Sequence, residues 1–83
     1  MFEVTEPNSV KQYNKILTVA YKMELGIEIA YQSNWNVVLR CPNIDVAYTL
    51  VAKLTRKQNW ETEIRPGKRN HIAHYVRIKF IRE

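Results

Sequence analysis

Basic side chains are concentrated at the end of the chain. Residues 65–83 contain Arg65, Lys68, Arg69, Arg77, Lys79 and Arg82, with Glu83 as their one carboxylate. Residues 1–64 contain seven bases and seven acids, so the net charge of +5 comes entirely from this last segment. Guanidinium and ammonium groups neutralise phosphates and release their counterions. The segment therefore predicts contact with a polyanion.

Two imidazoles lie within the same segment. His71 and His74 are three positions apart, and the one thiol, Cys41, is distant in sequence. A zinc site needs four such ligands, or three and a water, so we expect no metal and no cofactor. The pair could act as general acid and base in RNA cleavage, with Lys68 or Arg69 stabilising the phosphorane. The hypothesis that we favour is that both histidines hydrogen-bond phosphate or base, and that the protein is not an enzyme.

A β-hairpin must position these side chains. Apolar and polar residues alternate over residues 60–65 and 75–81, as expected for two half-buried strands. Folding about Asn70 gives the core-face pairs Trp60–Phe80, Thr62–Ile78 and Ile64–Val76 and the open-face pairs Glu61–Lys79, Glu63–Arg77 and Arg65–Tyr75. Opposed apolar pairs and opposite charges favour this register. Because Glu61 and Glu63 then face Lys79 and Arg77, we expect freer charges at Arg65, Lys68 and Arg69, with Arg82 as a further candidate.

Two helices are predicted before the hairpin. Apolar residues at helical spacing indicate one helix over residues 9–25, with Ser9 and Gln12 as a capping box and Gly26 as the residue after its end. The second helix is predicted over residues 43–58, where Asn43 can cap the first turn.

Three further strands complete the prediction. Residues 2–5 are expected to form the first, and residues 27–31 and 35–40 the next two, joined by the loop 32–34. Their predicted core-face pairs are Tyr31–Trp35, Ile29–Val37 and Ile27–Leu39. The order is then β-α-β-β-α-β-β. We expect a single α+β domain spanning residues 1–83, a two-layer sandwich with two helices on one face of a mostly antiparallel sheet and a long basic C-terminal hairpin.

The pattern places a single aromatic residue, Tyr75, on the open face of the sheet, whereas Trp35 and Trp60 are expected in the core. A protein that binds RNA on its sheet face stacks bases on two or three aromatic side chains. The sequence therefore favours recognition by the hairpin tip, residues 66–74, and its flanks.

Bulk composition narrows the class of protein. An apolar fraction of 46% in 83 residues indicates one folded domain, and a single cysteine fits a reducing compartment. We expect no signal peptide, and no apolar run in the sequence is long enough to span a bilayer. We therefore expect a cytoplasmic location and no membrane partner.

The predicted layout resembles the Alba-like architecture and the C-terminal domain of bacterial translation initiation factor three. The resemblance rests on the helices at 9–25 and 43–58, followed by the strand at 60–65, the basic loop and the strand at 75–82. It implies a small α/β sandwich that binds nucleic acid through its last hairpin. The small, glycine-poor chain, with its lysines and asparagines, is also similar to phage-encoded early proteins.

Three functions compete for the basic hairpin. The first is nucleic-acid binding, with RNA slightly preferred to DNA. The alternative is a protein-binding inhibitor or antitoxin-like factor, of the phage-encoded kind, whose hairpin docks on an acidic or RNA-bearing enzyme. The second alternative is a small RNase. The candidate binding residues are Arg65, Lys68, Arg69, His71, His74, Tyr75, Arg77, Lys79 and Arg82.

Overall fold

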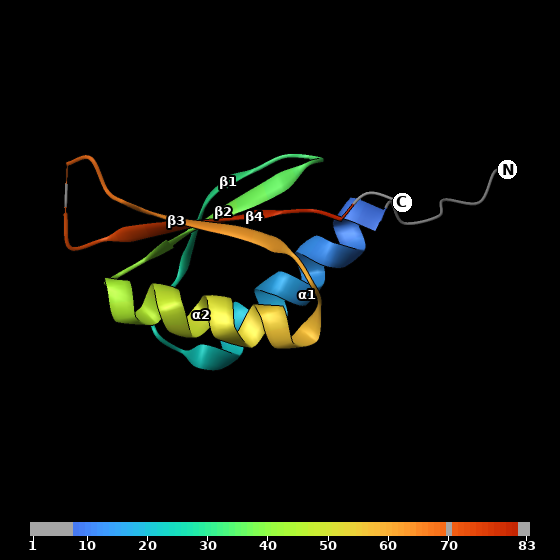
Figure 1. The fold of residues 1–83 in the computed structure, drawn as a ribbon, viewed down its shortest axis with the longest axis horizontal. Coiled ribbons are helices and arrows are strands. Elements are labelled where there is room, and N and C mark those ends of the chain that lie inside the picture. The colour runs from blue at the N-terminus through green and yellow to red at the C-terminus, as the bar shows by residue number, and fades with distance from the viewer. Residues whose placement is uncertain (1–7, 70, 82–83) are drawn as a thin grey trace, which may run out of the picture.

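The structure is a computed structural model that describes residues 8–69 and 71–81. Two helices lie on one face of a four-stranded antiparallel sheet (Figure 1), which confirms the predicted α+β sandwich. The elements are α1 (Asn8–Met23), β1 (Glu28–Gln32), β2 (Asn36–Cys41), α2 (Ile44–Lys57), β3 (Glu61–Pro66) and β4 (His74–Lys79). The strand predicted over residues 2–5 and the candidate binding residue Arg82 lie outside the described residues.

The described chain consists of two successive units, each a helix followed by a β-hairpin. The sheet order is β1-β2-β4-β3, so the second strands of the two units lie together at the centre and their first strands form the edges. The central strands bury Val37, Leu39, Val76 and Ile78 completely against the helices. Because side chains alternate between the faces of a strand, their neighbours on β2 and β4 lie on the open face.

Both helices begin and end near their predicted limits. Asn43 caps α2, since its Oδ1 accepts a hydrogen bond from the Val46 backbone N–H at 3.0 Å, as predicted. The capping box predicted for the first helix is wrong, because α1 begins at Asn8 and the Gln12 side chain is buried against Trp60 and Ile81. Gly26 has the positive φ, 73°, that is typical of a residue after a helix end. The helix already ends before it, because Glu24 also has a positive φ, of 53°.

The first hairpin differs from its predicted register. A bulge between Ile29 and Tyr31 pairs Ile29 with Leu39 and Tyr31 with Val38. An extra residue in one strand moves the following side chains to the other face, so Tyr31 lies on the open face instead of the core. Trp35 lies in the connecting loop and is 55% exposed, so its predicted burial is also wrong. Trp60 is buried as predicted.

Within residues 8–69 and 71–81, neither helix has the length and apolar character needed to cross a bilayer.

Candidate nucleic-acid interface

The basic hairpin has the register that the alternation predicts. Glu61 lies opposite Lys79, Glu63 opposite Arg77, and Arg65 opposite Tyr75. Strand pairing continues to Pro66 and His74, one residue further toward the tip than expected. The backbone N–H of Gly67 donates to the Ala73 carbonyl at 2.8 Å and closes the base of the tip. The tip projects beyond the helical layer (Figure 1).

The ion pairs on this hairpin differ from the expected ones. Glu63 pairs with Arg65 on its own strand rather than with Arg77 across the ladder, whereas Lys79 lies 3.8 Å from Glu61. No carboxylate among the described residues is within ion-pair distance of Arg77. Arg77 is therefore a freer cation than the sequence suggested, and Arg65 a less free one.

A row of three residues crosses the open face beside the tip. Tyr75 on β4 lies between Arg40 on β2 and Arg65 on β3, its two cross-strand partners. Arg40 is also 3.9 Å from Glu28 on the edge strand. Both ion pairs of this row are solvent-exposed, so each adds little to stability. The row presents one half-buried phenol ring with a guanidinium on either side.

This row forms one side of a cleft at the hairpin tip. The cleft has a volume of about 510 Å³ and contains four cationic groups and one aromatic ring. Its lining residues are Arg40, Arg65, Pro66, Gly67, Lys68, Arg69, Ala73 and Tyr75. None of these described residues is acidic, so the cleft is a positively charged concavity with a stacking surface in one wall.

Sequence reasoning missed Arg40 as a member of this site. Its alternation with Val37 and Leu39 places it on the open face, but no local pattern shows that β2 lies beside β4. The cleft exists because these two central strands, from different hairpins, pair along their whole length. A sheet order is set by long-range packing, which a single sequence does not display.

The remaining described candidates, His71, His74, Arg77 and Lys79, do not line the cleft. Arg77 and Lys79 line a smaller depression of about 270 Å³ on the open face, whose walls also contain Glu61 and Glu63. Mixed charge makes this depression a weaker phosphate site than the cleft. Tyr31, opposite Val38, is a second aromatic residue on the same face and, unlike the half-buried Tyr75, is exposed.

The two histidines are not paired with each other. His71 is exposed, and the Nδ1 atom of His74 donates to the Ile72 carbonyl at 2.9 Å. A carbonyl oxygen can only accept, so this contact places a proton on Nδ1 of His74. No cluster of three or more potential metal ligands occurs within residues 8–69 and 71–81.

The single cysteine is a core residue. Cys41 is fully buried, and this burial raises the pKa of its thiol to about 11. A thiol with so high a pKa forms little thiolate at neutral pH and is a poor nucleophile. Cys41 therefore packs as a small buried side chain of the core.

Compared with known proteins, the chain matches no protein family, no curated protein and no solved structure.

Proposed function

We propose that this chain is a non-enzymatic nucleic-acid-binding protein that holds single-stranded nucleic acid, RNA in preference to DNA, at the hairpin tip. The cleft supports this proposal most directly, because it combines Arg40, Arg65, Lys68 and Arg69 with the ring of Tyr75 and includes no carboxylate among its described lining residues. A cationic groove with an aromatic platform is the usual design of a single-strand binder.

The row Arg40–Tyr75–Arg65 gives the binding mode. A base stacked on Tyr75 would gain about 1–3 kcal/mol. The two arginines stand one strand to either side of the ring, about 10 Å apart from backbone to backbone. They can therefore contact phosphates on both sides of the stacked nucleotide. Lys68 and Arg69 extend the cationic surface along the tip.

The existing ion pairs do not oppose this mode strongly. Arg40 and Arg65 have exposed carboxylate partners, Glu28 and Glu63. Exposed pairs contribute at most about 1 kcal/mol, whereas arginine binds phosphate through charge-assisted, often bidentate hydrogen bonds. A phosphate group can replace either carboxylate at small cost.

RNA is preferred in this proposal because its unpaired loops and bulges offer splayed bases for stacking. Of the other described candidates, His71 and His74 lie near the tip, whereas Arg77 and Lys79 line the separate depression and could contact a longer strand. The buried, single thiol of Cys41 fits the reducing cytoplasm as the site of action.

One observation favours the alternative of a protein-binding inhibitor. Ile72 lies at the hairpin tip with 70% of its surface exposed. An exposed apolar side chain within a basic loop suits a hydrophobic pocket on an acidic or RNA-bearing enzyme. If the tip captures a protein from native lysate after nuclease treatment, and Ile72→Ser abolishes that capture while preserving the melting curve, this alternative replaces RNA binding.

The decisive experiment reverses two charges at the tip. Anisotropy of a labelled, mixed-sequence single-stranded RNA is measured with the parent, with Lys68→Glu/Arg69→Glu and with Lys11→Glu/Lys15→Glu. The control variant makes the same charge change on exposed positions of α1. We expect the tip variant to lose binding and the control to retain it, with unchanged melting curves for both.

Salt dependence gives a second readout for the milder variant Lys68→Gln/Arg69→Gln. Loss of two phosphate contacts should reduce the slope of log affinity against log salt by about 1.4 for a single strand. If the tip and control variants weaken RNA binding equally, net charge alone explains the loss of affinity, and this result would contradict the proposed site. RNA cleavage that disappears in His74→Ala would contradict the non-enzymatic assignment.

A further inference from the structure

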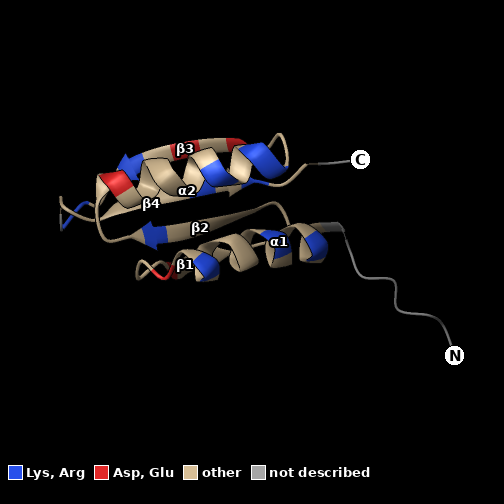
Figure 2. Cartoon of the chain, turned by 90° about the horizontal axis from the view of Figure 1, so that it is seen from below, with Lys and Arg blue, Asp and Glu red and all other residues tan. Residues whose placement is uncertain are grey.

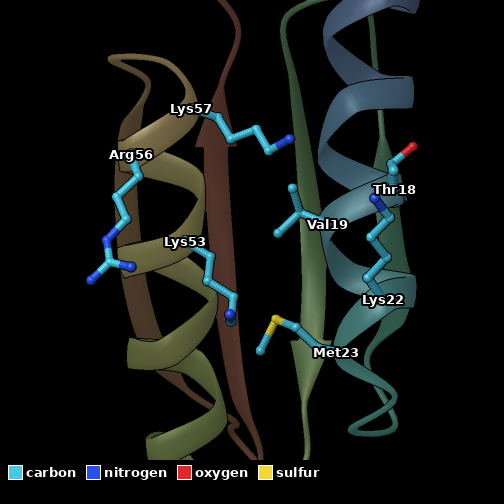
Figure 3. Close-up of a pocket in the computed structure, with 7 residues that line it drawn as sticks. All are labelled: Thr18, Val19, Lys22, Met23, Lys53, Arg56 and Lys57. Carbon is cyan, nitrogen blue, oxygen red and sulfur yellow. The ribbon is translucent and has the colours of Figure 1, made fainter.

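A second cationic cleft lies on the opposite side of the molecule, between the two helices. It has a volume of about 530 Å³ and is lined by Thr18, Val19, Lys22, Met23, Lys53, Arg56 and Lys57. Figure 3 shows Lys53 and Lys57 reaching from α2 toward α1, and Val19 and Met23 reaching from α1 toward α2. The α2 wall of the cleft is therefore basic, whereas the α1 wall combines the apolar Val19 and Met23 with Lys22 and Thr18.

Charge in the helical layer is strongly one-sided. The spans of α1 and α2 carry the six bases Lys11, Lys15, Lys22, Lys53, Arg56 and Lys57, many of them visible in Figure 2. Asp45 is the one acid in these two spans, and it stands eight residues before Lys53 on α2. At 1.5 Å per residue that is about 12 Å along the helix axis. None of the seven described residues lining the cleft is acidic.

The apolar wall has helical spacing. Val19 and Met23 are four residues apart and so lie on one face of α1. Val19 is 7% exposed, and the partly buried Met23 packs against the core cluster. A methionine side chain adapts its shape to different apolar partners. The aliphatic stems of Lys53 and Lys57 extend this surface across the cleft.

We propose that the interhelical cleft binds an acidic amphipathic helix of a partner protein. Two apolar side chains one helical turn apart on the partner would pack against Val19 and Met23. Its flanking carboxylates would pair with Lys53 and Lys57 on one side and with Lys22 on the other. This is helix-in-groove recognition with charge complementarity at the rim.

Nucleic acid fits this cleft less well than it fits the tip. Phosphates would satisfy the lysines but leave the Val19–Met23 wall without an apolar partner. No aromatic ring lines the cleft among the described residues, so an unpaired base finds no stacking surface there. The helical layer and the open face are on opposite sides of the sheet (Figure 1), so the two clefts can be occupied together.

The test uses a labelled acidic peptide of about 15 residues, long enough for several helical turns. Leucines at i, i+4 and i+7 form its apolar stripe, glutamates flank the stripe, and a scrambled peptide keeps the composition. Anisotropy is measured with the parent, Lys53→Glu/Lys57→Glu and the matched control Lys11→Glu/Lys15→Glu. We expect the parent to bind the patterned peptide at least about tenfold more tightly than the scrambled one.

The variants assign the binding to the cleft. Lys53→Glu/Lys57→Glu should weaken the patterned peptide at least about tenfold, while the control stays within a factor of about two of the parent. A patterned peptide carrying lysine in place of glutamate should bind the reversed variant better than the parent. If charge reversal unfolds the protein, Lys53→Gln/Lys57→Gln takes its place.

Three outcomes overturn the inference. They are equal affinity for patterned and scrambled peptides, equal weakening by the cleft and control variants, and displacement of the peptide by RNA in the variant Lys68→Glu/Arg69→Glu. The last outcome would mean that the interhelical cleft binds nucleic acid instead of a protein helix. Because the tip proposal is tested with RNA and this one with a peptide, either can fail while the other stands.

Discussion

Gln12 joins three segments that are far apart in the sequence. Its side-chain oxygen accepts hydrogen bonds from the Trp60 indole N–H and the Ile81 backbone N–H, both at 2.7 Å, and its amide donates to the Ile81 carbonyl at 2.8 Å. The residue is 2% exposed. One amide thus ties α1 to the start of the basic hairpin and to the segment after β4.

We expect Gln12→Leu to destabilise the protein by about 2–4 kcal/mol, because it removes the buried hydrogen bonds that Gln12 makes to the Trp60 indole and the Ile81 backbone. An unpaired buried polar group costs about 1–3 kcal/mol, and a small domain has only about 5–15 kcal/mol in total. Urea unfolding followed by tryptophan fluorescence measures the change. The exposed Asn14→Leu on the same helix is the control and should stay within about 0.5 kcal/mol of the parent. A Gln12→Leu midpoint equal to that of Asn14→Leu would contradict the role assigned to Gln12.

Residue-scale contacts were only partly predictable. Gln12 lies four residues before the buried Ile16, so the helical period alone places it on the core-facing stripe. The capping-box pattern predicted that the same side chain would bond to the backbone at the start of the helix. The structure shows it in the core, as the helical period predicts. The ion-pair partner of Glu63 was harder still to predict from the sequence. A strand register determines which residues lie opposite each other, but it does not determine which rotamer the Glu63 side chain adopts.

The two hairpins differ in how firmly their sequences fix the register. In the second hairpin, both faces of the ladder match at once, and the predicted pairs from Glu61–Lys79 to Arg65–Tyr75 occur. In the first, every residue of β1 is exposed, so burial does not select one register. A bulge then costs little, and it moves Tyr31 to the open face. Sequence alternation therefore predicts a register only where one face of the strand is buried.

Exposure of β1 leads to a prediction about local stability. Amides of β1 should exchange with solvent through local opening, orders of magnitude faster than those of β2 and β4, which need global unfolding. Native-state hydrogen exchange followed by NMR measures the difference. The other edge strand, β3, is the internal comparison and should be better protected, because Thr62 and Ile64 are half-buried. Equal protection of β1 and β4 would show that another group covers the β1 edge.

At the scale of the whole molecule, the distribution of charge along the chain differs from its distribution in space. By sequence, the excess positive charge lies entirely in residues 65–83. In the fold, the helices carry six bases and one acid, whereas Glu61 and Glu63 lie on β3 beside the bases of the hairpin and Glu28 lies on β1 opposite Arg40. Of the described acids that balance the helix bases in the sequence count, only Asp45 lies within a helix, whereas three lie in strands of the sheet. The interhelical cleft could not be found without the packing of α1 beside α2.

This one-sided charge predicts that salt stabilises the protein. Like charges four residues apart on a helix, such as Lys11–Lys15 and Lys53–Lys57, each cost about 0.2–0.5 kcal/mol, and salt screens this repulsion. The three ion pairs among the described residues are exposed and lose little stabilisation when screened. Raising sodium chloride from about 20 mM to about 500 mM shortens the Debye length from roughly 20 Å to roughly 4 Å. We expect a gain of about 1 kcal/mol, or about 4–8 °C in the melting temperature.

The variant Lys53→Gln/Lys57→Gln should be more stable than the parent at low salt and gain less from added salt. A melting temperature that falls with added salt would mean that the exposed ion pairs outweigh the repulsion within the helical layer.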